Sequence, residues 1–254
     1  MADLMQNTPR SHGIMNAESP TRLTTDAGIT AAINELTLAK PYLGRQRDWA
    51  TIADAPADYR DDLDELVEAV QLAKMNPRLS DEAKWSDIDG ITRAWLPEAE
   101  RLVRSLEDAA ARWERELTDA ARPPAPTTDE ILLEAKLANA RSDAVLVLDR
   151  ATTDEDVADR LAEMATGADP ALSYLVLGTS WIATYFRSRG TNMAALLWEE
   201  KKRQVLAEVL TDAALEAHKK IAGVPHARKA AHALRAAHNF FQHDNAELFG
   251  GSGA

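Results

Sequence analysis

Apolar residues recur at every third or fourth position through most of this chain, and no other feature limits its fold as strongly. The series Leu102, Leu106, Ala109, Trp113 and Leu117 stays on one side of a helix that turns by about 100° per residue. Capping residues and helix breakers separate such segments from one another. No segment predicts a strand. The sequence therefore predicts an all-α protein, a multi-helix bundle of about eight helices.

Composition agrees with a folded protein and excludes several kinds of chemistry. Of the 254 residues, 45% are hydrophobic and 28% are charged, which is typical of a globular chain that can bury a core. The sequence contains no cysteine. A disulfide framework, a thiolate nucleophile, a cysteine-ligated zinc and an iron–sulfur cluster are therefore excluded.

A proline-rich segment suggests where the chain divides. Residues 122–128 read RPPAPTT, and prolines at this density cannot propagate a helix. We expect a flexible N-terminal arm (1–23), an N-terminal helical unit (24–121), a proline-rich linker (122–126), a C-terminal helical unit (127–245) and a flexible tail (246–254).

Breakers predict the ends of individual helices. We expect Pro41 to end the first helix, Pro56 to occupy the first turn of the second, and the long helix of the first half to begin after Gly90. In the second half, residues 170–189 and 192–222 each predict one continuous helix.

The sequence predicts neither a membrane segment nor a secretory signal. Its longest uncharged stretch covers seventeen residues, 170–186, and includes serine, threonine and glycine. A membrane span needs about 20 strongly apolar residues, so we expect a buried core helix here. Residues 1–22 are polar and lack the apolar run of a secretory signal. We expect a cytoplasmic protein with no membrane contact.

Charge is distributed unevenly along the chain. Residues 1–170 carry 34 acidic and 19 basic side chains, whereas residues 171–254 carry 7 acidic and 10 basic ones. Arg228, His232 and Arg235 would form one stripe of the final helix, and with Lys219 and Lys220 they are the candidate binding residues. The stripe is either a solvated face or a contact for an acidic partner, another copy or a phosphate backbone. The net charge of −12 restricts nucleic acid to this basic C-terminal helix.

The histidines do not predict a metal site. His226, His232, His238 and His243 follow one another at steps of five or six residues, so no two successive ones share a helix face. Glycine-rich phosphate loops and a nucleophile elbow are also missing from the sequence. We predict no metal and no cofactor.

One string near the C-terminus resembles a catalytic motif. The residues from His238 to His243 read HNFFQH and are similar to the R-N-x-x-x-H segment of HEPN-family ribonucleases, which are all-helical and cleave RNA without metal. The resemblance implies His243 as catalytic base and Asn239 as its polar neighbour. His238 stands where the family has arginine, and imidazole cannot hold phosphate in the bidentate manner of guanidinium. The other interpretation is a helix whose Phe240 and Phe241 dock on the bundle.

These observations lead to one main hypothesis for the function. We expect a non-enzymatic helical interaction or assembly protein, such as a self-associating bacterial or phage component, that buries apolar helix faces against copies or protein partners. Charge complementarity would fix the register. The alternative is a HEPN-like metal-independent ribonuclease or nucleic-acid-binding effector using the C-terminal basic helix. A third hypothesis is a nucleic-acid mimic that uses the acidic cluster of residues 58–68.

Overall fold

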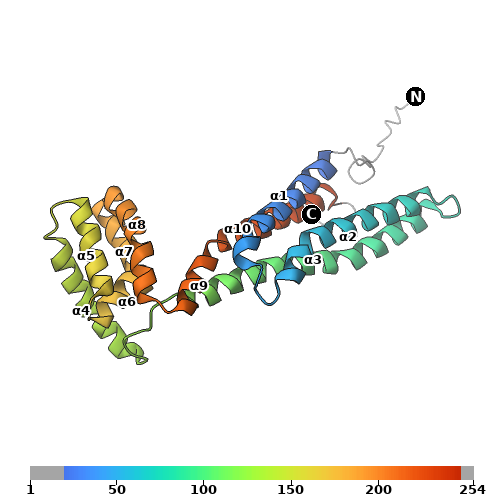
Figure 1. Cartoon of the computed structure of the whole chain (residues 1–254). Helices are drawn as coiled ribbons and strands as arrows, with labels where there is room; N and C mark the ends of the chain where they lie inside the picture. Colours follow the sequence, from blue (N-terminus) through green and yellow to red (C-terminus); the bar gives the residue numbers. More distant parts are fainter. Residues whose placement is uncertain (1–19, 247–254) are drawn as a thin grey trace. The chain divides into compact units, whose positions relative to one another are not determined.

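The computed structural model describes residues 20–246, and that part of the chain consists of ten α-helices and no strand (Figure 1). The helices are α1 (Pro20–Leu43), α2 (Trp49–Met75), α3 (Asp81–Ala120), α4 (Glu130–Leu148), α5 (Asp154–Thr166), α6 (Pro170–Gly178), α7 (Trp181–Arg189), α8 (Asn192–Val209), α9 (Asp212–Ile221) and α10 (Val224–Asp244). The prediction of an all-α, multi-helix protein is confirmed.

The chain forms two compact units whose boundary differs from the predicted one. Of the described residues, 20–114 and 222–246 form unit 1, and 115–221 form unit 2. The helix α10 therefore belongs with α1, α2 and most of α3, and the predicted C-terminal unit of residues 127–245 is split between the two units. The reason is that α10 packs on α1, a contact between distant parts of the sequence. The predicted arm and tail lie almost entirely outside the described residues.

In unit 1, α1 and α10 lie side by side (Figure 1). The two backbones approach closely where Gly28 faces α10. A Cβ atom on Gly28 would lie 2.8 Å from the Cβ of Ala237 and 3.3 Å from the carbonyl oxygen of Ala233. A residue without a Cβ is therefore needed at this point of the helix pair.

Aromatic and polar contacts join the start of α2 to α3 in the same unit. The rings of Trp49 and Trp113 have their centroids 5.7 Å apart. The indole N–H of Trp113 donates a hydrogen bond of 3.0 Å to Asp48, which also forms an ion pair with Arg112. The indole of Trp113 thus contributes both apolar burial and a directed hydrogen bond.

Unit 2 has its own core, supplied mainly by α4 to α8. The most buried large side chains include Leu161 on α5, Leu175 on α6 and Trp198 on α8, each at most 1% exposed. The helix α5 packs on α8, and α4 packs on α6 and α5. Burial of these apolar faces is the main stabilising contribution in unit 2.

Two prolines lie within helices instead of bounding them, which corrects the predicted ends. α1 continues past Pro41 to Leu43, and Pro56 lies inside α2. Ile52 and Tyr59 are both buried, so the apolar face of α2 runs unbroken across Pro56. An interior proline costs about 3 kcal/mol. Burial of the continuous face outweighs that cost.

Gly90 likewise fails to begin a new helix. α3 passes through it, because Ile88 and Trp95 are buried on the same face before and after the glycine. A glycine inside a helix costs only about 1 kcal/mol relative to alanine, and continuous burial exceeds this.

Two segments that were predicted to be single helices are each divided by a threonine. Thr179 adopts an extended backbone after α6, and its hydroxyl accepts a hydrogen bond of 3.2 Å from the N–H of Trp181. The hydroxyl of Thr211 accepts a bond of 3.3 Å from the N–H of Ala214 between α8 and α9. Each threonine therefore supplies a hydrogen-bond acceptor to the N-terminus of the next helix, which favours a break over one long helix.

Candidate functional site

Arg235, a predicted binding residue, is engaged inside unit 1. Its guanidinium donates two hydrogen bonds to the carboxylate of Glu107, at 2.9 and 2.6 Å, and one of 2.7 Å to Glu100. Both acids belong to α3. The hydrogen bond from Arg235 is the main cause that lowers the pKa of Glu100 to about 2, and the two carboxylates raise the pKa of Arg235. Arg235 therefore joins α10 to α3 and is not free for an external anion.

The other predicted binding residues are placed separately. Arg228 is exposed and pairs with Glu114 of α3, and His232 is exposed. Lys219 and Lys220 lie on α9, which belongs to unit 2, and the ammonium of Lys219 pairs with Glu216 at 2.8 Å. The predicted set therefore spans two units, and two of its arginines already have carboxylate partners within unit 1.

His238 is buried in unit 1, with 1% of its surface exposed. Its Nδ1 lies 3.0 Å from the hydroxyl of Tyr59, and its Nε2 lies 2.9 Å from the amide nitrogen of Gln242 and 3.2 Å from Glu100. Burial lowers the pKa of His238, which favours a neutral imidazole, and burial also raises the pKa of Tyr59. We call Tyr59, Glu100, Glu107, Arg235 and His238 the polar cluster of unit 1.

The ribonuclease-like string is not assembled into one surface. His238 points into the polar cluster, whereas Asn239 and His243 are exposed on α10. Phe241 is buried and Phe240 is 38% exposed, so only one of the two phenylalanines docks fully. The structure therefore does not bring His238 together with the other two residues of the motif. Ribonuclease activity stays a prediction that RNA incubation would test.

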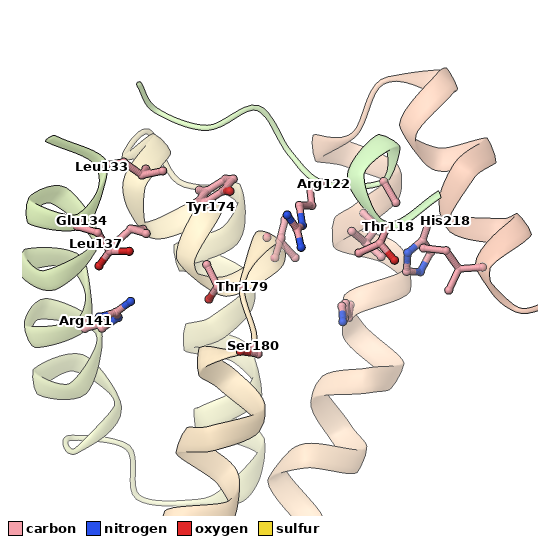
Figure 2. Close-up of a pocket in the computed structure, with 16 residues that line it drawn as sticks. Thr118, Arg122, Leu133, Glu134, Leu137, Arg141, Tyr174, Thr179, Ser180 and His218 are labelled. Atoms are coloured by element: carbon pink, nitrogen blue, oxygen red, sulfur yellow. The ribbon is translucent and has the colours of Figure 1, made fainter. Parts of the chain in front are cut away.

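Unit 2 contains a pocket of about 630 Å³ that the sequence did not predict, because its lining comes from α3, α4, α6, α8, α9 and the loops after α3 and α6 (Figure 2). Its charged lining consists of Arg122, Glu134, Arg141, Lys202 and His218. Burial is the first cause that lowers the pKa of His218, and the nearby charge of Lys202 adds to it.

The positive charge of this pocket is already reduced by neighbours on the same helices. Arg122 pairs with Asp119 at 3.3 Å, and Lys202 pairs with Glu199 at 3.7 Å. Thr179 lines the pocket too, but its hydroxyl donates to the carbonyl of Leu175. The arrangement can attract a small anion by charge but offers few free donors to hold one.

The helix α4 presents an exposed apolar face to the outside of unit 2. We call Ile131, Ala135, Ala138, Ser142 and Leu146 the outer face of α4. At about 100° per residue these positions fall within an arc of about 80°. All five are exposed, Ile131 by 86% and Leu146 by 59%. The Ser142 hydroxyl donates to the carbonyl of Ala138 at 3.2 Å, so its polar group is satisfied within the helix.

This face lies opposite the one that α4 buries. Leu137, Ala140, Ala144 and Leu148 face the core of unit 2 and are at most 4% exposed. The helix is therefore apolar on two opposite sides, and its charged residues lie on the two flanks between them. The core accounts for only one of these two apolar sides. The second apolar side is visible in the sequence pattern, so the outer face could have been predicted from it.

The described residues hold no group of three or more metal-ligating side chains. Within residues 20–246, none of the helices has the length and apolar character required to traverse a lipid bilayer. Comparison with known proteins gave no match to any family model, curated protein or solved structure.

Proposed function

We propose that this chain is a non-enzymatic interaction protein that acts by docking the outer face of α4 onto another protein surface. One observation carries the proposal: the face is uncharged and exposed, with Ile131 and Leu146 at its ends. Large exposed apolar side chains that gather on one helix face are typical of protein contact sites. An assembly component of a bacterial or phage particle is one protein that would work in this way.

The outer face of α4 suits this role better than its counterpart on α8. Met193 and Leu196 of α8 are 57% and 67% exposed, but the same side of that helix continues through the exposed residues Glu200 and Arg203. Burying those charges in an interface would require partners for them. The outer face of α4 carries no such cost along its length.

Apolar burial provides the free energy for docking. Complete burial of an aliphatic side chain contributes about 1.5 to 3 kcal/mol. Ile131 and Leu146, together with three small residues between them, would supply the core of a modest contact. The basic residues of α10 contribute less than the sequence suggests, because Arg228 and Arg235 pair within unit 1.

Sedimentation velocity of the full chain over a range of concentrations tests the proposal. We expect reversible association that Ala138→Glu weakens at least about tenfold, because the variant places a charge in the middle of the apolar face. Ala207→Glu is the matched control, since Ala207 is exposed on α8 in the same unit. Equal weakening by both variants, or a chain that neither self-associates nor binds a partner through this face, would contradict the proposal.

A further inference from the structure

We infer that the partner of the outer face of α4 is the same face of a second copy, with the two α4 helices antiparallel. The inference rests on the proposed function, because it names the occupant of the surface that was proposed to dock. It goes further by fixing the direction of the pair, its register and the charges that hold it.

The arrangement of residue sizes suits a two-fold pair. In a two-fold interface, if residue i of one copy contacts residue j of the other, then residue j of the first copy contacts residue i of the other. An axis that passes between Ala138 and Asn139 places Ile131 opposite Leu146 of the second copy, and Ala135 opposite Ser142. Small side chains then meet near the axis and allow close approach of the helices, and large ones cover both ends.

Charges along one edge of the face favour the same register. Glu134 and Arg141, which also line the pocket of unit 2, are seven positions apart and lie on the same edge of the outer face. In an antiparallel pair this edge lies against the same edge of the second copy. Glu134 then faces Arg141 of the second copy, and Arg141 faces Glu134 of the second copy. Within residues 20–246 neither side chain forms an ion pair. The two-fold pair would therefore supply counter-charges that the folded chain does not.

A parallel pair does not obtain these contacts. In that arrangement the edge that carries Glu134 and Arg141 meets the opposite edge of the second helix. The nearest residues there are Leu132, Asn139 and Leu146, which are uncharged. Charge complementarity therefore selects the antiparallel direction.

The contact predicts a weak, reversible dimer. From Ile131 to Leu146 the face extends about 22 Å at 1.5 Å per residue. One helix pair of this length belongs to the smallest class of specific interfaces. We expect a dissociation constant on the order of 0.1 mM, which is in the range of transient contacts.

Single-cysteine variants test the direction and the register, because the native chain contains no cysteine. The variants are Ala138→Cys near the axis, Ile131→Cys and Leu146→Cys at the two ends, and Ala207→Cys on α8 as the exposed control. Each variant is first treated by itself with a mild oxidant. Ile131→Cys is then mixed with Leu146→Cys that carries a tag, so that the mixed dimer differs in size, and the mixture is oxidised in the same way. Disulfide-linked dimers are measured on non-reducing gels.

The antiparallel pair predicts rapid cross-linking of Ala138→Cys alone and of the mixture, but slow cross-linking of Ile131→Cys alone. Rapid cross-linking of Ile131→Cys alone would overturn the inference in favour of a parallel pair. If the wild-type chain dimerises but no α4 variant cross-links faster than Ala207→Cys, the inference fails while self-association stands. A chain that stays monomeric but binds another protein through α4 would also overturn the inference and leave the docking function intact.

Charge reversal provides a second test that does not depend on disulfide geometry. Glu134→Arg and Arg141→Glu should each weaken dimerisation several-fold, since each places like charges opposite one another. The double variant with both substitutions restores opposite charges and should recover the wild-type dissociation constant. Failure of the double variant to recover, with both single variants weakened and folded, would contradict the register.

Discussion

The helices α10 and α4 have similar lengths, 21 and 19 residues, but they use their side chains in opposite ways. α10 carries a basic stripe, and Arg235 and Arg228 of that stripe pair with carboxylates of α3 within unit 1. α4 exposes an uncharged face on the far side from its core. A charged stripe in a sequence can therefore belong to the fold, while the surface left for partners is apolar.

Replacing Arg235 should give the largest loss of stability among the substitutions in unit 1. In Arg235→Ala, Glu107 loses its guanidinium partner at a partly buried position, and Glu100 keeps only the guanidinium of Arg104. We expect the free energy of unfolding of unit 1 to fall by about 2 to 3 kcal/mol. Urea unfolding combined with hydrogen exchange of α3 and α10 peptides would measure it.

Arg228→Ala is the matched control for this substitution. The side chain of Arg228 is 59% exposed, so loss of its ion pair with Glu114 should change the free energy by less than about 0.5 kcal/mol. Equal losses of free energy from the two variants would show that Arg235 contributes no more to the fold than an exposed surface charge does. The contrast between α10, whose charges belong to the fold, and α4 would then not hold.

Acid should weaken unit 1 through Glu100. Its pKa is lowered to about 2 in the folded chain, from an ordinary value of 4.5. The ionised carboxylate therefore stabilises unit 1 above about pH 4.5, and this contribution is lost as the pH falls toward 2. Because the side chain is 25% exposed, we expect a loss of only about 1 to 2 kcal/mol. Urea unfolding across this range should show it, and Glu100→Gln should flatten the dependence.

His238 adds to the same trend at higher pH. Burial lowers its pKa below the ordinary value of 6.5, so the unfolded chain takes up a proton that the folded chain does not. Stability should therefore begin to fall as the pH drops below about 6.5. A free energy of unfolding that is constant between pH 7 and 5, measured by exchange in α10, would contradict this assignment.

Gly28→Ala should cause a smaller loss, of about 1 kcal/mol. The added methyl would lie 2.8 Å from the Cβ of Ala237, which is fixed to the backbone of α10 and cannot rotate away. The cost of overpacking, about 1 to 3 kcal/mol, exceeds the gain in helix propensity of about 1 kcal/mol.

Gly90→Ala is the control for that substitution. No atom lies within 4 Å of the added methyl at Gly90, which is also inside a helix. There the propensity gain acts alone and should raise the free energy of unfolding by about 0.5 to 1 kcal/mol. Stabilisation by both variants, measured by urea unfolding, would show that α1 and α10 can separate without cost.

Much of the fold could be predicted from periodicity and helix ends, but not the partners of the polar side chains. The all-α class follows from apolar spacing alone. The sequence places Arg235 on the basic stripe of the final helix, but its pairing with Glu100 depends on a contact between positions far apart in the sequence. Local sequence contains no information on which acidic helix lies opposite.

The burial of His238 could have been inferred. It follows Leu234 by four positions and precedes Phe241 by three, so it lies on the apolar face of α10. The same residue also belongs to the string that resembles a catalytic motif, which would require it to be exposed. The helix breaks at Thr179 and Thr211 are also indicated by the sequence, because each threonine stands just before a new helix and can cap it. The apolar spacing continues across both positions, however, and on its own predicts one continuous helix.

The smallest effect on stability should come from the outer face of α4, and it completes the comparison with α10. Ala138→Glu should change the free energy of unfolding of unit 2 by less than about 0.5 kcal/mol, because an exposed helix position away from packed contacts tolerates substitution. Ala140→Glu, two positions along on the buried face, should unfold unit 2 because Ala140 is 3% exposed and an unpaired carboxylate would enter the core. Circular dichroism and exchange in α5 and α8 would separate the two outcomes. If Ala138→Glu destabilises unit 2 as much as Ala140→Glu does, the outer face is covered within the folded chain and is not a surface for partners.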